Sequence, residues 1–362
     1  MTKQNVYLWC SGPTDQTGSL LAEKLKINWG TKKPDLKNTS LIIGWGTKTK
    51  HEIDLKKIPV INHPNKIREN RNKLHALQTM KKVSIPIPNF VPANMILDQL
   101  EKDEDKIVKL PVIGRTSFHQ GGEGMWVCPT IGQVHSAINE GATYFQNMID
   151  IDKEYRVHVI GNEIIYVTRK IQRSKEEMRK AFVCKEFERQ KTLAKKNHDP
   201  FNEEQVKKVL ERQASKMVVD HLIRSNTRGW KFAHVTKYDK KLADKSIMAV
   251  KTLNLEFGAV DCCIDTNNNI WIIEVNTGPG LEASSFYAYV NKFAKIIDNI
   301  LNSKYVDKTI ETMFSVENKK SEKITDLRTS MVNKAIFMSE MIEKANNDQL
   351  DTLKSVFSKM FN

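Results

Sequence analysis

Short apolar runs separated by glycine and proline mark the elements of the first part of the chain. The predicted strands cover residues 5–10, 40–46 and 58–63. Helical spacing of apolar positions predicts helices over residues 18–27 and 66–83. Strands that alternate with helices are typical of a small parallel sheet, so residues 1–85 are predicted to form an N-terminal α/β domain.

A different pattern follows in the middle of the chain. Two stretches of period-two alternation flank Gly161-Asn162, which predicts an antiparallel hairpin. From Arg169 to Lys216 the pattern becomes helical and polar, with 15 Lys and Arg against 8 Asp and Glu. This segment is either a solvated helical hairpin or a basic flap over an anionic ligand.

Two apolar strands are predicted at residues 257–264 and 270–276, and both carry acids. Glu274 and Asn276 are two residues apart, so their side chains point to the same face of the second strand. A hairpin would place Asp261 beside them. Three oxygen donors of this kind suit Mg²⁺. A carboxylate in an apolar strand is costly unless it is paired or metal-bound, and satisfaction by backbone donors is the structural alternative.

Composition narrows the class of protein. The 362 residues carry a formal net charge of +14, which indicates a polyanionic partner or an anionic ligand, unless the charge serves solubility alone. The five cysteines form no CxxC pair, which is typical of reduced thiols in a cytosolic protein. No apolar run reaches the length of a membrane span. We therefore expect a cytoplasmic protein.

The stretches "FGAVDCCID" and "WIIEVNTGPGLE" resemble the metal site of ATP-grasp enzymes, especially the RimK-like carboxylate–amine ligases. The resemblance implies an α/β (α+β) ATP-grasp fold, in which two α+β subdomains clasp ATP. It also implies that Asp261, Glu274 and Asn276 hold one or two Mg²⁺ ions, with Mn²⁺ as an alternative, that bridge the phosphates of ATP.

Further motifs resemble the parts of this family that hold the phosphates. In "KLHALQTMKKVSIPIP" the matching residue is Lys73, which the resemblance places on an ATP phosphate. In "PVIGRTSFHQGGEGMWVC" the phosphate-contacting cation is Arg115, with Lys109 as a rival. The flexible loop that closes over the phosphates would contain His119, Gly121, Gly122 and Gly124. Its glycines would let the backbone approach phosphate closely.

The stretch "ATYFQNMIDIDKEYRVHV" resembles the adenine hinge and the acid that follows it. The hinge residues would be Phe145, Gln146 and Asn147. Glu154 matches the acid that accepts the ribose hydroxyls. Arg156 lies two residues further on the same face, where it pairs either with Glu154 or with a substrate.

The resemblance assigns catalytic roles to two segments. Arg169, at the end of the returning strand, matches an arginine that faces the acyl phosphate. In "IRSNTRGWKF", Arg224 and Asn226 would bind phosphate or the tetrahedral intermediate. These motifs run in family order over residues 60–290, roughly.

The predicted organisation has four parts. After the N-terminal domain, residues 86–168 are predicted to form a small subdomain with the glycine-rich loop. Residues 169–301 form a C-terminal subdomain with a helical insert near 170–216, and residues 302–362 form a helical tail. The implied activity joins an amino acid or similar acid to an amine on a peptide, protein or modified nucleic acid, through an acyl-phosphate intermediate. The alternatives are an ATP-dependent phosphotransferase and a non-catalytic nucleic-acid-binding protein. The oligomeric state stays open.

Overall fold

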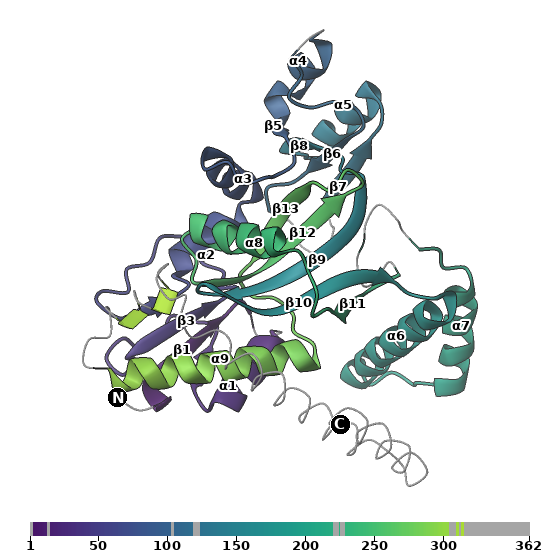
Figure 1. Cartoon of the computed structure of the whole chain (residues 1–362). Helices are drawn as coiled ribbons and strands as arrows, with labels where there is room; N and C mark the ends of the chain where they lie inside the picture. The colour runs from purple at the N-terminus through teal and green to yellow at the C-terminus, as the bar shows by residue number, and fades with distance from the viewer. Residues whose placement is uncertain are drawn as a thin grey trace, which may run out of the picture.

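Figure 1 shows the computed structural model of the chain. The structure describes residues 3–12, 15–102, 105–118, 124–219, 224, 229–303, 309–310 and 313–314. Four predicted site residues lie outside these ranges: His119, Gly121, Gly122 and Asn226. Within the described residues the strands form three sheets.

The first sheet is parallel, as predicted, and has the order β2-β1-β3-β4. Its strands are β1 (Val6–Cys10), β2 (Asn28–Gly30), β3 (Leu41–Trp45) and β4 (Val60–Ile61). The helices α1 (Gln16–Leu25) and α9 (Ala283–Asn302) share one apolar core with β1 and β3. A helix from the far end of the sequence, α9, therefore packs into the core of the N-terminal domain.

The predicted helix over residues 66–83 is two helices, α2 (Pro64–Arg71) and α3 (Lys73–Lys82). Asn72 separates them, because its backbone is extended at φ −75° and ψ 98°. The Asn72 side chain accepts a hydrogen bond from the backbone N–H of His75 and so caps α3. The break places Lys73 in the first turn of a new helix.

The small antiparallel sheet has the order β5-β8-β6-β7. Its strands are β5 (Phe90–Pro92), β6 (Val112–Arg115), β7 (Met125–Cys128) and β8 (Tyr144–Asn147). The 3-10 helix at Ala93–Met95, α4 (Ile96–Glu101) and α5 (Ile131–Asn139) accompany these strands. Residues of α4 and α5 cover one face of the sheet with an apolar core of its own.

The large antiparallel sheet has the order β11-β10-β9-β12-β13. Its strands are β9 (Ile151–Ile160), β10 (Glu163–Gln172), β11 (Trp230–His234), β12 (Phe257–Asp265) and β13 (Ile270–Asn276). The hairpin at Gly161-Asn162 is confirmed, and Gly161 has the positive φ of 62° that such a turn requires. The helix α8 (Lys240–Thr252) covers one apolar face, and the other face carries the polar residues described below.

The sheets group two strands differently from the predicted subdomains. β9 and the first six residues of β10 fall in the predicted small subdomain, yet these strands pair with β12 and β11 in the large sheet. The insert is a helical hairpin of α6 (Lys175–Asn197) and α7 (Glu203–Ser215), and it projects from the body in Figure 1. None of the described helices has the length and apolarity that crossing a bilayer would need.

Candidate active site

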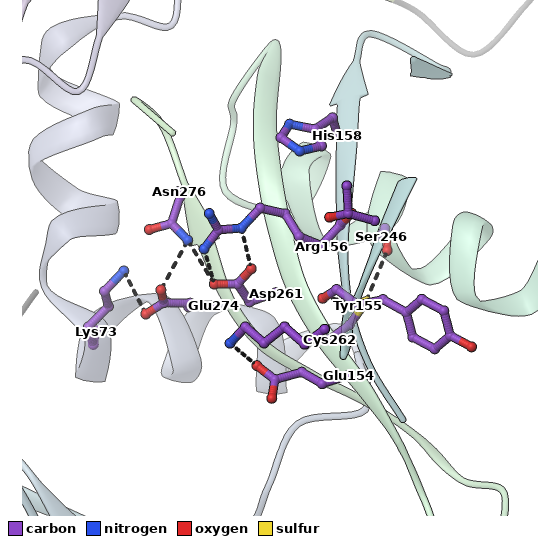
Figure 2. A network of polar contacts seen from close by, with 12 residues as sticks. Lys73, Glu154, Tyr155, Arg156, His158, Ser246, Asp261, Cys262, Glu274 and Asn276 are labelled. Atoms are coloured by element: carbon purple, nitrogen blue, oxygen red, sulfur yellow. Dashed lines mark hydrogen bonds and ion pairs between the residues drawn. The ribbon is translucent and has the colours of Figure 1, made fainter. Parts of the chain in front are cut away.

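The β12–β13 hairpin brings the three predicted metal ligands together. Asp261 is directly opposite Glu274 in the ladder, and Ala259 is opposite Asn276, so the three polar side chains share one face. The Asn276 side-chain Nδ2 donates to Asp261 Oδ2 at 3.1 Å and to Glu274 Oε1 at 3.0 Å. Figure 2 shows this carboxamide between the two carboxylates. The convergence expected from the sequence is confirmed.

Each of the two carboxylates also contacts a cation that is remote in sequence. Arg156 donates from Nε to Asp261 Oδ1 at 2.7 Å and from Nη2 to Oδ2 at 2.9 Å, a bidentate pair. Lys73 Nζ lies 3.3 Å from Glu274 Oε2. Burial lowers the pKa of Arg156, but the charge of Asp261 and its hydrogen bonds outweigh this effect and hold the pKa above its usual value. Arg156 thus pairs with Asp261 and not with Glu154.

Glu154 has its own partner on the same face. Only 8% of the residue is exposed, and Lys170 Nζ donates to its Oε1. Burial raises the pKa of the Glu154 carboxyl, while Lys170 opposes the shift. Arg224 lies close enough to act on the same carboxyl; it donates to the carbonyl of Ile151 at 2.8 Å and stacks over Trp230 at 4.7 Å from the ring centroid.

The structure does not bring Arg169 to this face. Arg169 is opposite Tyr155 in the β9–β10 ladder, and Tyr155 belongs to the apolar core under α8. The reason is an irregularity between Ile164 and Tyr166, where the register shifts by one residue. A regular ladder would place Arg169 opposite Glu154, whereas the shift places Lys170 there. Lys170 is a site residue that the sequence did not single out.

Lys73 and Arg115, the two predicted phosphate contacts, line one small cavity with Glu274. The cavity lies between α3, the small sheet and β13, and Tyr144 contributes an aromatic wall. Lys109, the rival of Arg115, is exposed on the surface, and its backbone N–H donates to Asn147 Oδ1. Between the two, the structure places Arg115 with the carboxylates.

The predicted hinge residues occupy the two faces of β8. Phe145 is fully buried in the core of the small sheet, so it does not offer a free wall to adenine. Gln146 is 6% exposed, and Asn147 accepts the hydrogen bond from Lys109. Tyr144, one residue earlier, is the β8 side chain that reaches the cavity. Alternation along β8 explains the one-residue difference.

Gly124 ends the predicted glycine-rich loop. Its φ is +58°, and a Cβ there would lie 2.7 Å from Thr116 Oγ1. The Thr116 N–H donates to the Gly124 carbonyl at 3.1 Å, which closes the base of the loop. Glycine is therefore required at this position for both conformation and space.

The edge strand β11 adds aromatic rings that sequence reasoning did not assign to the site. The Arg156 guanidinium lies 4.6 Å from the centroid of the Phe232 ring, and Lys170 Nζ lies 5.6 Å from it. Phe232 is opposite Lys170 in the ladder and so points to the polar face. Its period-two position in β11 was the only available signal.

A family model described as a RimK-like ATP-grasp domain matches residues 203–300, which include Arg224, Asp261, Glu274 and Asn276. Residues 203–300 therefore belong to a RimK-like ATP-grasp domain. No curated protein matches the chain in sequence. The resemblance over the earlier residues, including Lys73 and Arg115, therefore rests on their motifs and on the fold.

Solved structures extend the ATP-grasp likeness to most of the chain. The D-alanine–D-alanine ligase from Bacillus anthracis has 11% identity and a TM-score of 0.51, over 91% of this chain and 98% of that one. N5-carboxyaminoimidazole synthetase from Staphylococcus aureus, complexed with ADP, has 11% identity and a TM-score of 0.50, over 76% and 71%. The macrocyclase MdnC from Microcystis aeruginosa MRC, bound with precursor peptide MdnA, has 11% identity and a TM-score of 0.50, over 81% and 99%. At this identity the likeness shows the ATP-grasp fold alone.

The donor set of this ATP-grasp site fits a hard divalent cation. Among the described residues no three His, Cys, Asp or Glu side chains gather at one place, so the set depends on Asn276 as its third member. Its amide presents Nδ2 to both carboxylates, and ligation through Oδ1 requires the amide to rotate. Two carboxylate groups and one amide oxygen are ligands that Mg²⁺ and Mn²⁺ accept.

Proposed function

We propose that the chain is an ATP-dependent carboxylate–amine ligase that works through an acyl-phosphate intermediate. The observation that carries the proposal is the face of the large sheet on which Asp261, Glu274 and Asn276 converge beside Lys73 and Arg156. Paired charges of both signs, next to the small sheet of an ATP-grasp fold, suit the phosphates of ATP and their metal.

The reaction has two steps. A substrate carboxylate oxygen attacks the γ-phosphorus, the bond from γ-phosphorus to the bridging oxygen breaks, and ADP leaves. An amine then attacks the acyl carbon, inorganic phosphate leaves, and the amine loses a proton. Phosphoryl transfer needs positioning and charge neutralisation more than covalent help from the protein. The site supplies these through side chains that are already ordered.

The roles of the side chains follow from where they lie. Lys73, in the first turn of α3, and Arg115 would bind the phosphates from the small-sheet side of the cavity. Lys170, in β10, and Arg224, which contacts the start of β9 through the Ile151 carbonyl, would bind oxygens that gain charge during the two steps. We assign to Lys170 the role that the family resemblance implied for Arg169. Glu154 would accept the ribose hydroxyls.

Mg²⁺ held by Asp261, Glu274 and Asn276 would neutralise phosphate charge when bound. The cavity beside these residues measures about 10 Å³, which is room for about one water molecule. A nucleotide phosphate that entered this cavity would require the small sheet and α3 to separate from β13. Closure afterwards would exclude water, to which an acyl phosphate is labile.

The acid is expected to be an amino acid or a similar acid, and the amine to lie on a peptide, a protein or a modified nucleic acid. The peptide in the MdnC structure supports a peptide acceptor by analogy of fold only. The net charge of +14 favours an acidic substrate, whether an acidic peptide or a modified nucleic acid. Mass spectrometry of products formed from MgATP and pooled amino acids, peptides and oligonucleotides would identify the pair.

The chemistry itself is tested with hydroxylamine. A ligase of this mechanism releases ADP and yields a hydroxamate when hydroxylamine replaces the amine. A phosphorylated product without hydroxamate would instead show a phosphotransferase. Salt-sensitive binding of nucleic acid without turnover of ATP would show a binding protein.

Glu274→Gln tests the site. This change removes one charge from the proposed metal ligands and leaves Lys73 without its partner, so ADP formation should fall by about a hundredfold or more. The control is Glu204→Gln on α7, whose partner is Lys208 and whose side chain is 80% exposed. A Glu274→Gln protein that forms ADP at the wild-type rate would contradict the assignment.

A further inference from the structure

The proposed metal ligands already have counter-ions of matching number. Asp261 is 6% exposed and accepts hydrogen bonds from both Nε and Nη2 of Arg156. Glu274 is held by Lys73, and both members of that pair are mostly buried, with side-chain exposures of 13% for the lysine and 21% for the glutamate. The two carboxylates and their two partner cations balance without any metal, and Arg115, which lines the same cavity as Glu274, adds a further positive charge.

Adding a divalent cation to this cluster would leave at least two positive charges in excess. Buried like charges repel strongly because little solvent screens them. The phosphates of ATP carry the negative charge that would restore the balance. The cluster is therefore built to accept metal and nucleotide together and to resist the metal alone.

Arg156 also has a second support besides its ion pair. Its guanidinium stacks on Phe232 at 4.6 Å, a contact that does not depend on Asp261. An arginine held by a ring can turn its N–H groups from a carboxylate to a phosphate without leaving the site. The bidentate geometry that suits a carboxylate suits a phosphate equally well.

We propose that Arg156 is an exchangeable counter-ion of Asp261, which keeps the metal off this carboxylate until nucleotide phosphate attracts the guanidinium away. The inference rests on the proposed function, because it takes MgATP as the ligand. Arg156 acts here on the order of binding: metal affinity becomes coupled to nucleotide affinity through one side chain.

The test measures Mn²⁺ binding by electron paramagnetic resonance, with and without a non-hydrolysable ATP analogue. Wild type should bind Mn²⁺ weakly alone and at least about tenfold more tightly with the analogue. Arg156→Gln should bind Mn²⁺ alone about tenfold more tightly than wild type, and the gain from the analogue should shrink. Arg156→Lys, with the charge but no bidentate contact, should fall between them.

The matched control is Lys170→Gln. It removes one positive charge from the same face, but the carboxylate it frees is Glu154, which is not one of the three proposed metal ligands. An equal rise in Mn²⁺ affinity in both variants would show a general effect of charge and would overturn the exchange. Unchanged affinity in Arg156→Gln would overturn it as well.

The melting temperature provides a second measurement, which tests the proposal even if the variant is less stable than wild type. If Arg156→Gln is less stable, Mn²⁺ alone should raise its melting temperature while leaving that of wild type unchanged. The two proposals fail differently. Wild type that binds no MgATP would refute the proposed function, whereas MgATP binding with nucleotide-independent Mn²⁺ affinity would refute the exchange alone.

Discussion

His158 is a buried neutral side chain on the same face of the large sheet as the charged residues of the site. It is 2% exposed, its Nδ1 lies 3.3 Å from the Tyr289 hydroxyl, and Arg156 is two residues away on the same face. Burial, and then the charge of Arg156, lower the pKa of His158 to about 3. A folded-state pKa below that of the unfolded chain means that protonation favours unfolding.

His158 should therefore make the protein less stable as the pH falls below about 6.5, the ordinary histidine value. Between pH 8 and pH 5, wild type should lose about 2 kcal/mol more unfolding free energy than His158→Gln. Urea unfolding of both proteins at both pH values measures the difference. The same substitution at exposed His51 is the control and should keep the wild-type pH dependence. Equal losses in wild type and His158→Gln would contradict the buried neutral state.

At the residue scale, the sequence predicts the three acidic and amide side chains of the site but not the cations that contact them. Asp261, Glu274 and Asn276 could be placed together because alternation and a turn-rich connection define a local hairpin. Their cations could not, since Lys73 and Arg156 reach them through tertiary contacts. Such long-range pairs leave no periodic trace in the sequence.

At the scale of elements, a one-residue irregularity decides which cation faces the site. The parallel sheet, the hairpin at Gly161-Asn162 and the helical insert were predictable from pattern. The register shift in β10 was not, and it exchanges the faces of Arg169 and Lys170. The break at Asn72 was likewise missed, because the helical pattern continues across it while the cap does not show in periodicity.

A contact between the turn after β13 and the residue that follows β3 joins the N-terminal sheet to the site. After β13 the chain turns through Gly278-Pro279-Gly280, and the Gly46 N–H donates to the Thr277 carbonyl at 3.1 Å. A Cβ on Gly278 would lie 2.8 Å from the Gly46 Cα and 2.9 Å from its nitrogen. Backbone cannot move aside as a flexible side chain can, so only glycine fits.

Gly278→Ala should consequently destabilise the protein by about 1–3 kcal/mol, the usual cost of inserting a methyl group into packed structure. Gly280→Ala is the control on the same turn, because nothing lies within 4 Å of its Cβ position. Urea unfolding of the two variants beside wild type measures both effects. Equal stability of the two variants would show that the turn moves freely from β3.

The whole molecule places its charged site in a compact body and its helical insert outside it. Between residues 187 and 207 no side chain of α6 or α7 is buried, whereas Met178, Leu210 and Ala214 nearer the base are. The two strands that flank the insert are already joined, since the Arg173 N–H donates to the Gly229 carbonyl at 2.9 Å. The outer part of the hairpin thus contributes little to the fold.

Replacing residues 187–207 by a short glycine linker should leave the unfolding free energy within about 1 kcal/mol of wild type, because surface changes rarely cost more. Binding of a fluorescent ATP analogue should also persist, since Lys73, Arg115 and the carboxylates lie elsewhere. If the truncation weakens binding, it should weaken binding of the macromolecular or acidic substrate. The affinity for that substrate should then be lower and should depend less on salt concentration. A truncated protein that no longer binds the analogue would show instead that the hairpin belongs to the nucleotide site.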